Sequence, residues 1–133
     1  MILLTDRELI EMAKTASSHA YSPYSRFSVG AALECADGTV VTGCNVENAA
    51  LGCTICAERT AVCNAVSMGK RRFVRIAIYA DSPDYCTPCG TCRQVLNEFS
   101  PDIEVLCARG DGRYVSYRLR DLLPLSFGSS FLE

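Results

Sequence analysis

The chain has 133 residues, of which 49% are hydrophobic and 21% charged, and its formal net charge is −2. This length and composition are typical of a globular protein, so we expect a single domain over residues 1–133. The chain has no basic excess, no tryptophan, no run of ~18 apolar residues and no secretory signal, so we expect a cytoplasmic protein that binds neither nucleic acid nor membranes.

The first half of the chain predicts a helix followed by a β-hairpin. Thr5 and Glu8 are spaced as a capping box, and an apolar stripe follows them. Proline and serine then break the pattern, and two strand-like runs flank the turn residues Asp37-Gly38. The predicted elements are a helix over residues 5–19, strands over residues 27–35 and 39–44, and a loop over residues 45–55.

The second half of the chain alternates helices with short β-branched strands. Its first helix is apolar over most of its circumference, which indicates burial on several sides. The predicted elements are helices over residues 56–68, 90–99 and 118–123, a loop over residues 81–88, and strands over residues 75–80, 103–108 and 114–117. This alternation predicts an α/β fold, a three-layer α-β-α sandwich with a mixed five-stranded sheet.

Two short segments carry the strongest chemical signal, namely Cys56-Ala57-Glu58 and Pro88-Cys89-Gly90-Thr91-Cys92. Three thiolates supply three ligands to one tetrahedral zinc ion and leave a fourth position for water, which is typical of a catalytic site. Glu58 is not needed as a ligand and is free to carry protons. This arrangement is the signature of zinc-dependent nucleobase deaminases.

Both segments open predicted helices, whose free N–H groups and positive ends stabilise thiolates. Residues two apart in a helix point roughly 200° apart, so Cys56 and Glu58 converge only if Cys56 lies at the helix cap. Three thiolates also bring excess negative charge to a zinc ion. Arg59 is placed to reach a ligand sulfur and offset that charge. Arg93 is a weaker candidate for this role, and a structural role is the simpler reading of it.

Other residues leave alternatives open. Asn45 and Glu47 alternate by two, and an amide beside a carboxylate suits sugar hydroxyls, although a plain polar loop explains the pair equally well. Phe27 is able to stack on a planar base, but core packing is the commoner role. Cys53 and Cys86 are the local candidates for a fourth, closing metal ligand, while a buried apolar role is the simpler reading of Cys53.

Together these segments resemble the small homotetrameric type of cytidine deaminase, and the resemblance covers nearly the whole chain. It implies that the three cysteines bind one Zn²⁺ per chain and that Glu58 shuttles protons. It also implies hydrolytic deamination of cytidine and deoxycytidine to uridine and deoxyuridine, with ammonia released, as a step of pyrimidine salvage. The matching stretches are residues 20–32, 43–49, 56–61, 88–96 and 122–128.

The resemblance further implies roles in substrate binding. Phe27 would stack on the pyrimidine, Asn45 and Glu47 would bind the ribose hydroxyls, and the N–H of Ala57 would contact the base carbonyl. The Arg59 guanidinium would hydrogen-bond to the ligand thiolates. The last implied role is that of Phe127, which would reach into the active site of a neighbouring subunit, so that each site is shared between chains of the tetramer.

The chain departs from the family pattern at two places. It reads Ala50-Leu51-Gly52 where Ser-Tyr-Gly is common, and Thr87 stands where serine often precedes Pro-Cys. Leu51 therefore removes a ring and a hydroxyl from the expected pocket between subunits. This change bears on the detail of that pocket and not on the chemistry.

Three other functions compete with nucleoside deamination. Blasticidin-S deaminases resemble this family around the metal, but they lack the segment Asn45-Val46-Glu47-Asn48. A non-catalytic zinc-binding module would need a fourth protein ligand to close the site. Deamination of polynucleotides is disfavoured because an acidic chain offers no basic channel.

Overall fold

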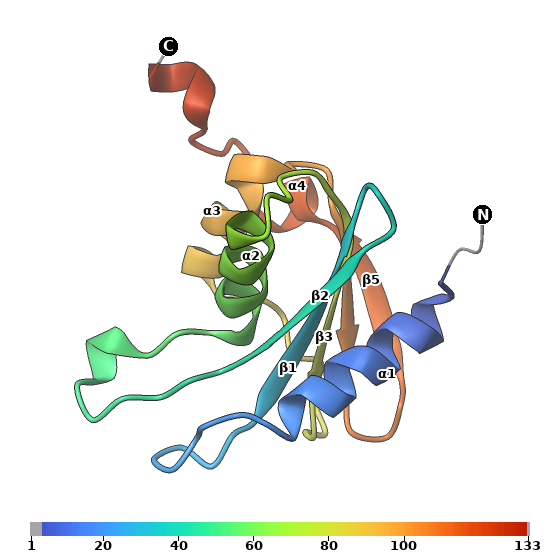
Figure 1. The fold of residues 1–133 in the computed structure, drawn as a ribbon, viewed down its shortest axis with the longest axis vertical. Coiled ribbons are helices and arrows are strands. Elements are labelled where there is room, and N and C mark those ends of the chain that lie inside the picture. Colours follow the sequence, from blue (N-terminus) through green and yellow to red (C-terminus); the bar gives the residue numbers. More distant parts are fainter. Residues whose placement is uncertain (1–3, 133) are drawn as a thin grey trace.

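The computed structural model describes residues 4–132 of the chain, which form a mixed five-stranded sheet with helices on both faces (Figure 1). The strand order is β2-β1-β3-β4-β5. Only β3 and β4 pair in parallel, and the other neighbours are antiparallel. The strands are β1 (Val29–Cys35), β2 (Val40–Cys44), β3 (Phe73–Ala80), β4 (Glu104–Ala108) and β5 (Tyr114–Arg118).

Two apolar clusters, one on each face of the sheet, define three layers. Successive residues of a strand point to opposite faces, so Leu33 joins the cluster beneath α2 (Ala57–Ser67) and α3 (Gly90–Phe99), whereas Ala32 joins the one beneath α1 (Asp6–Ser17). Figure 1 shows α1 on one side of the sheet and the other two long helices on the opposite side. The predicted three-layer α-β-α sandwich is therefore confirmed.

The parallel pair brings the two cysteine segments to one end of the sheet. α2 leads into β3, and α3 connects β3 to its parallel neighbour β4, as a crossover between parallel strands requires. Both helices therefore lie on the same face, and they contact each other. The short α4 (Leu119–Leu122) follows β5, and the chain then leaves the sheet in a segment that projects from the body of the molecule (Figure 1).

Most predicted boundaries agree with the structure within one residue, but α1 ends two residues earlier than predicted and β3 begins two residues earlier. Thr5 caps α1 in a capping box with Glu8, as predicted. β1 begins two residues later than predicted, because the Asn45 amide group forms hydrogen bonds with the carbonyl of Phe27 and the N–H of Val29. Two short 3₁₀ helices, Leu51–Cys53 and Ser129–Leu132, were not predicted.

No helix within residues 4–132 is long and apolar enough to cross a membrane. The prediction that the first residues form no secretory signal falls partly on residues 1–3, which lie outside the described part of the chain.

Candidate metal centre

Each of the two motif helices begins at a cysteine. Cys56 is the N-cap of α2, with φ −72° and ψ 155°, and Cys89 is the N-cap of α3, with φ −68° and ψ 167°. An N-cap residue has extended backbone dihedrals, so its side chain is not constrained to the helical spacing. The geometric condition set by the sequence, that Cys56 lies at the helix cap, is therefore met.

The three motif cysteines meet in space. The sulfur atoms of Cys56, Cys89 and Cys92 all lie within 4.8 Å of one another, and those of Cys56 and Cys89 are 3.9 Å apart. Two thiolates on one tetrahedral zinc ion, each at ~2.3 Å, would be separated by about 3.8 Å. The cluster is therefore positioned to hold a metal ion, and its all-sulfur donor set fits zinc.

The same geometry separates this cluster from the other candidate ligands. Among the side chains of residues 4–132, these three cysteines form the only group of three or more potential metal ligands. Cys53 and Cys86 stand outside it. Burial raises the pKa of Cys86 to about 11, helped by the nearby charge of Glu58.

The cluster thiols differ in how readily they ionise. Burial raises the pKa of Cys92, and the charge of Glu58 raises it further. Burial is also the main reason why the pKa of Cys56 is raised. For Cys89 burial acts in the same direction, but hydrogen bonds from the backbone and side chain of Cys92 and from Cys56 outweigh it, and its pKa is lowered.

Glu58 lies in the first turn of α2, and only 5% of its surface is exposed. Burial raises the pKa of its carboxyl group, and its own backbone N–H, the Cys92 thiol and Arg59 offset part of this effect. The charge of Glu58 in turn raises the pKa of both Cys56 and Cys92. A buried carboxylate thus lies within electrostatic reach of the sulfur cluster.

The guanidinium of Arg59 lies beside the same sulfur atoms. Its Nη2 donates a hydrogen bond to the carbonyl of Thr54 at 3.0 Å, while its buried Nε has no partner. Burial lowers the pKa of Arg59, but Cys56 and Cys92 more than offset this, so the pKa is raised. An unpartnered donor beside thiols fits a site that holds thiolates, because a thiolate accepts such a bond.

Arg93 has a structural role, which was the reading that the sequence favoured over charge compensation. Its Nε donates to the carbonyl of Pro88 at 2.7 Å, and its Nη1 donates to the carbonyl of Leu122 at 2.8 Å. Arg93 therefore ties the residue before Cys89 to the end of α4. A spacing argument has no means of detecting this bridge, because Leu122 is far away in the sequence.

Asn45 and Glu47 both point to the loop that carries Phe27, as their alternation predicted. The Asn45 amide group donates to the carbonyl of Phe27 at 2.8 Å and accepts from the N–H of Val29 at 2.9 Å. One oxygen of Glu47 accepts from the N–H groups of Tyr24 and Ser25 at 3.0 and 3.1 Å. The Phe27 side chain is 43% exposed, so it does not fill the core.

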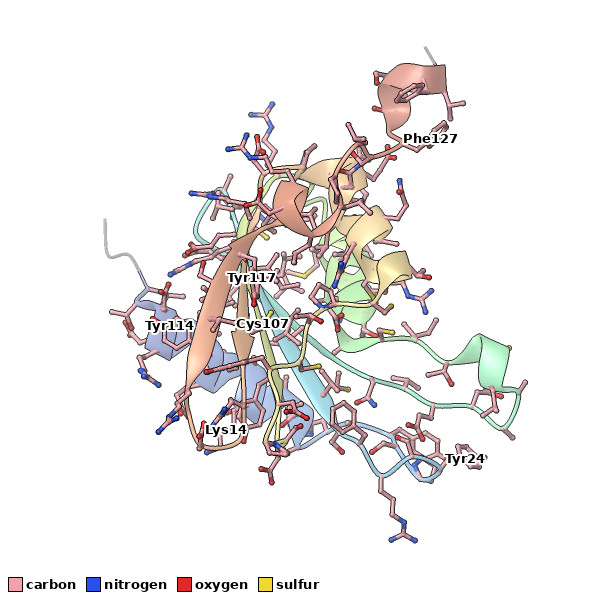
Figure 2. All side chains as sticks on the ribbon, turned by 180° about the vertical axis from the view of Figure 1, so that it is seen from behind. Lys14, Tyr24, Cys107, Tyr114, Tyr117 and Phe127 are labelled. Atoms are coloured by element: carbon pink, nitrogen blue, oxygen red, sulfur yellow. The ribbon has the colours of Figure 1, made fainter. Side chains whose placement is uncertain are left out.

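The remaining predicted substrate contacts lie in different places. Ala57 is the first residue of α2, where backbone N–H groups have no partner within the helix. Phe127 is 56% exposed and stacks on Phe131, with ring centroids 5.2 Å apart. Figure 2 shows Phe127 and Tyr24 at opposite ends of the molecule. One chain alone therefore does not bring Phe127 to the loop that carries Phe27.

Comparisons with known proteins agree with this geometry. A family model described as the cytidine and deoxycytidylate deaminase zinc-binding region matches residues 4–108. The chain is 53% identical to a cytidine deaminase of Sporosarcina psychrophila over 127 residues, which cover 95% of this chain and 93% of that one. It is 48% identical to that of Halalkalibacterium halodurans over 124 residues, covering 92% and 94%. The crystal structure of a cytidine deaminase from Burkholderia pseudomallei matches with a TM-score of 0.91 at 46% identity, covering 93% of this chain and 100% of that one.

Proposed function

Because this chain belongs to the cytidine and deoxycytidylate deaminase family, we propose that it hydrolyses cytidine and deoxycytidine to uridine and deoxyuridine, releasing ammonia. The family predicted from the sequence motifs is thereby confirmed. The observation that carries the proposal is the meeting of three sulfur atoms at two helix starts beside the buried Glu58. We also propose that residues 1–133 form one catalytic domain.

Cys56, Cys89 and Cys92 hold the zinc ion, one per chain. When bound, zinc supplies Lewis acidity that lowers the pKa of a coordinated water towards ~7. The three side chains leave one tetrahedral position without a protein donor, and Arg59 offsets part of the negative charge of the thiolates.

Glu58 moves the protons of the reaction. Its burial and raised pKa favour a carboxyl group that both accepts and releases protons. It accepts one proton from the attacking water and donates it to the pyrimidine ring nitrogen. It then accepts the remaining proton of the added hydroxyl and donates it to the leaving amine, so that two protons are taken up and two are delivered. The charge of Glu58 acts on all three ligand thiols, which supports a carboxylate close enough to the cluster for this exchange.

The substrate contacts follow from the neighbouring loops. The exposed ring of Phe27 stacks on the pyrimidine, and the free N–H of Ala57 binds the base carbonyl. Asn45 and Glu47 bind the ribose hydroxyls with the donor and acceptor positions that their contacts to the Phe27 loop leave open.

We propose that the protein acts as a homotetramer with shared active sites. The projecting C-terminal segment exposes apolar side chains, including 80% of Leu132 and 68% of Phe131, which is typical of a surface that packs against another chain. Its backbone is held to α3, since Gln94 and Asn97 donate to the carbonyl of Phe127 at 2.9 and 3.3 Å. This anchoring presents Phe127 to a neighbouring subunit.

We place the enzyme in the cytoplasm, in the salvage of pyrimidine nucleosides. All nine cysteines are unpaired in the structure, and the three at the metal centre need to be reduced in order to bind zinc. A reducing compartment meets this requirement.

A nucleoside panel tests the proposed reaction. Zinc-loaded protein is mixed with cytidine, deoxycytidine and blasticidin S, and the change in pyrimidine absorbance and the ammonia released are recorded together with zinc content. We expect turnover of both nucleosides and little of the antibiotic, because residues 45–48 carry the Asn and Glu side chains suited to a ribose. Glu58→Gln should keep its zinc and lose about 10²–10⁴-fold in rate. A zinc-loaded wild type without turnover would refute the proposed function.

Subunit mixing tests the shared site. Glu58→Gln and Phe127→Ala proteins, each weakly active, are mixed under conditions that allow subunits to exchange. If Phe127 serves a neighbouring chain, mixed tetramers contain sites with an intact Glu58 and an intact Phe127, and activity rises. Activity equal to the sum of the two parents, in tetramers shown by mass spectrometry to be mixed, would contradict sharing.

A further inference from the structure

Ser25 occupies an unusual position between two residues assigned to substrate binding. Its hydroxyl group donates a hydrogen bond to Oε2 of Glu47, and the Oγ of Ser25 accepts one from the N–H of Phe27 at 3.0 Å. The backbone N–H of Ser25 also donates to Oε1 of Glu47 at 3.1 Å. One small side chain thus links the carboxylate to the residue that carries the exposed ring.

The loop around Ser25 needs such a link, because its backbone is strained. Arg26 has φ 58°, in the left-handed region that residues other than glycine rarely adopt. Its N–H donates to the carbonyl of Ser22 at 2.9 Å, which closes a tight turn. Ser25 lies within this turn and Phe27 follows it, so the Ser25–Glu47 contact fixes the turn itself and the Asn45 amide group fixes the residue after it.

The contacts also determine what Glu47 has left to offer. A carboxylate has about four acceptor positions. Oε1 receives the N–H groups of Tyr24 and Ser25, while Oε2 receives the Ser25 hydroxyl. The hydrogen bond from Ser25 is also the main reason why the pKa of Glu47 is lowered, so this carboxylate stays ionised. The acceptor position that stays open is on Oε2, the oxygen that Ser25 holds.

We propose that Ser25 is a positioning residue for substrate recognition: its hydroxyl orients the free acceptor of Glu47 towards a ribose hydroxyl and links it to Phe27. This inference rests on the proposed function and adds a residue that the motif did not assign. Ser25 is exposed and touches Glu47 through polar atoms, so its replacement changes orientation without opening a cavity.

Substrates that lack ribose hydroxyls provide the test. The ratio kcat/KM is measured for cytidine and for 2′,3′-dideoxycytidine with the wild type, Ser25→Ala and Ser25→Thr. We expect Ser25→Ala to lower kcat/KM for cytidine about tenfold, mainly through a higher KM. Its kcat/KM for the dideoxynucleoside should stay within about twofold of the wild-type value. Ser25→Thr retains a hydroxyl and should retain the preference for cytidine.

Ser22→Ala is the matched control, because the Ser22 hydroxyl lies in the same loop and bonds to the hydroxyl of Ser28 at 2.9 Å rather than to Glu47. Ser22→Ala should lower kcat/KM equally for both substrates or leave it unchanged for both. Three results would overturn the inference. They are an equal loss of kcat/KM on both substrates in Ser25→Ala, no loss in that variant, and a loss in Ser25→Thr as large as in Ser25→Ala. If Ser25→Ala does not fold, Ser25→Gly takes its place. A wild type inactive on cytidine would instead refute the proposed function.

Discussion

Gly43 of β2 is the point where the sheet approaches the metal-binding helix most closely, and Gly43→Ala should disturb both stability and zinc binding. A Cβ atom at this position would lie 2.5 Å from the backbone nitrogen of Ala61 and 2.7 Å from the carbonyl oxygen of Ala57, both in α2. Ordinary contacts of a Cβ begin at 3.4 Å, so the helix would have to retreat by roughly 0.7–0.9 Å. Backbone atoms of a packed helix cannot rotate away.

The expected cost is that of overpacking a core, roughly 1–3 kcal/mol. Alanine has less conformational entropy than glycine in the unfolded chain, and this difference offsets about 0.4–1 kcal/mol of the cost. For a chain of this length the net loss should lower the midpoint of thermal unfolding by about 3–8 °C. Because Cys56 caps the displaced helix, zinc affinity should also fall about tenfold, as measured by competition with a chromogenic chelator.

Gly30→Ala is the matched control on the other face of the sheet. Its Cβ would meet the carbonyl oxygen of Ala13 at 1.9 Å and the nitrogen of Ser17 at 2.5 Å, both in α1. We expect this variant to be destabilised as well, but its folded fraction should bind zinc as tightly as the wild type. The reasoning fails if Gly43→Ala unfolds at the wild-type temperature, or if both variants lose the same zinc affinity.

Three further predictions concern the surroundings of the site. Arg93→Lys keeps the charge but not the guanidinium that binds two carbonyls at once, so its zinc affinity, measured by competition with a chelator, should fall about tenfold. An unchanged zinc affinity would assign Arg93 to packing alone. Asn97→Ala removes one of the donors to the carbonyl of Phe127, so amide hydrogen exchange should become faster in residues 123–132 and stay unchanged in β1. Unchanged exchange rates in residues 123–132 would contradict the anchoring role of Asn97. The Lys70 ammonium lowers the pKa of Asp37 to about 2, so the pair stabilises the fold at neutral pH and that contribution is lost as the pH falls through about 2. In Asp37→Asn, the free energy of unfolding should therefore depend less on pH between pH 4 and 2. An unaltered pH profile would refute the pairing.

Local signals in the sequence were enough to predict most of the elements. The capping box at Thr5, the turn at Asp37-Gly38 and the cysteine at the start of α2 are each determined by neighbours within a few residues. Gly38 has φ 89°, a conformation in which glycine is not strained, so the turn was readable from residue type alone. The metal cluster was predicted for the same reason, since two local spacings define it.

The contacts that could not be predicted join distant parts of the chain. Nothing near Asn45 in the sequence indicates that its amide group binds the carbonyl of Phe27 in place of a strand partner, so that β1 begins only at Val29. Likewise, the sequence left Cys86 as a possible ligand, and only the three-dimensional structure shows that it is not part of the sulfur cluster. Such contacts depend on how separate elements pack and not on local preference.

Neither α2 nor α3 has a hydrogen bond from its N-cap side chain, because a cysteine occupies the place where serine, threonine or aspartate usually closes a helix. The first turns of both helices therefore depend on the ion that the cysteines hold, in the way that other helices depend on a cap. Withdrawing zinc should thus fray the enzyme at two helix ends at once as well as stopping turnover. For a cell, the supply of this metal would then govern how long each molecule survives proteolysis, in addition to how fast it works.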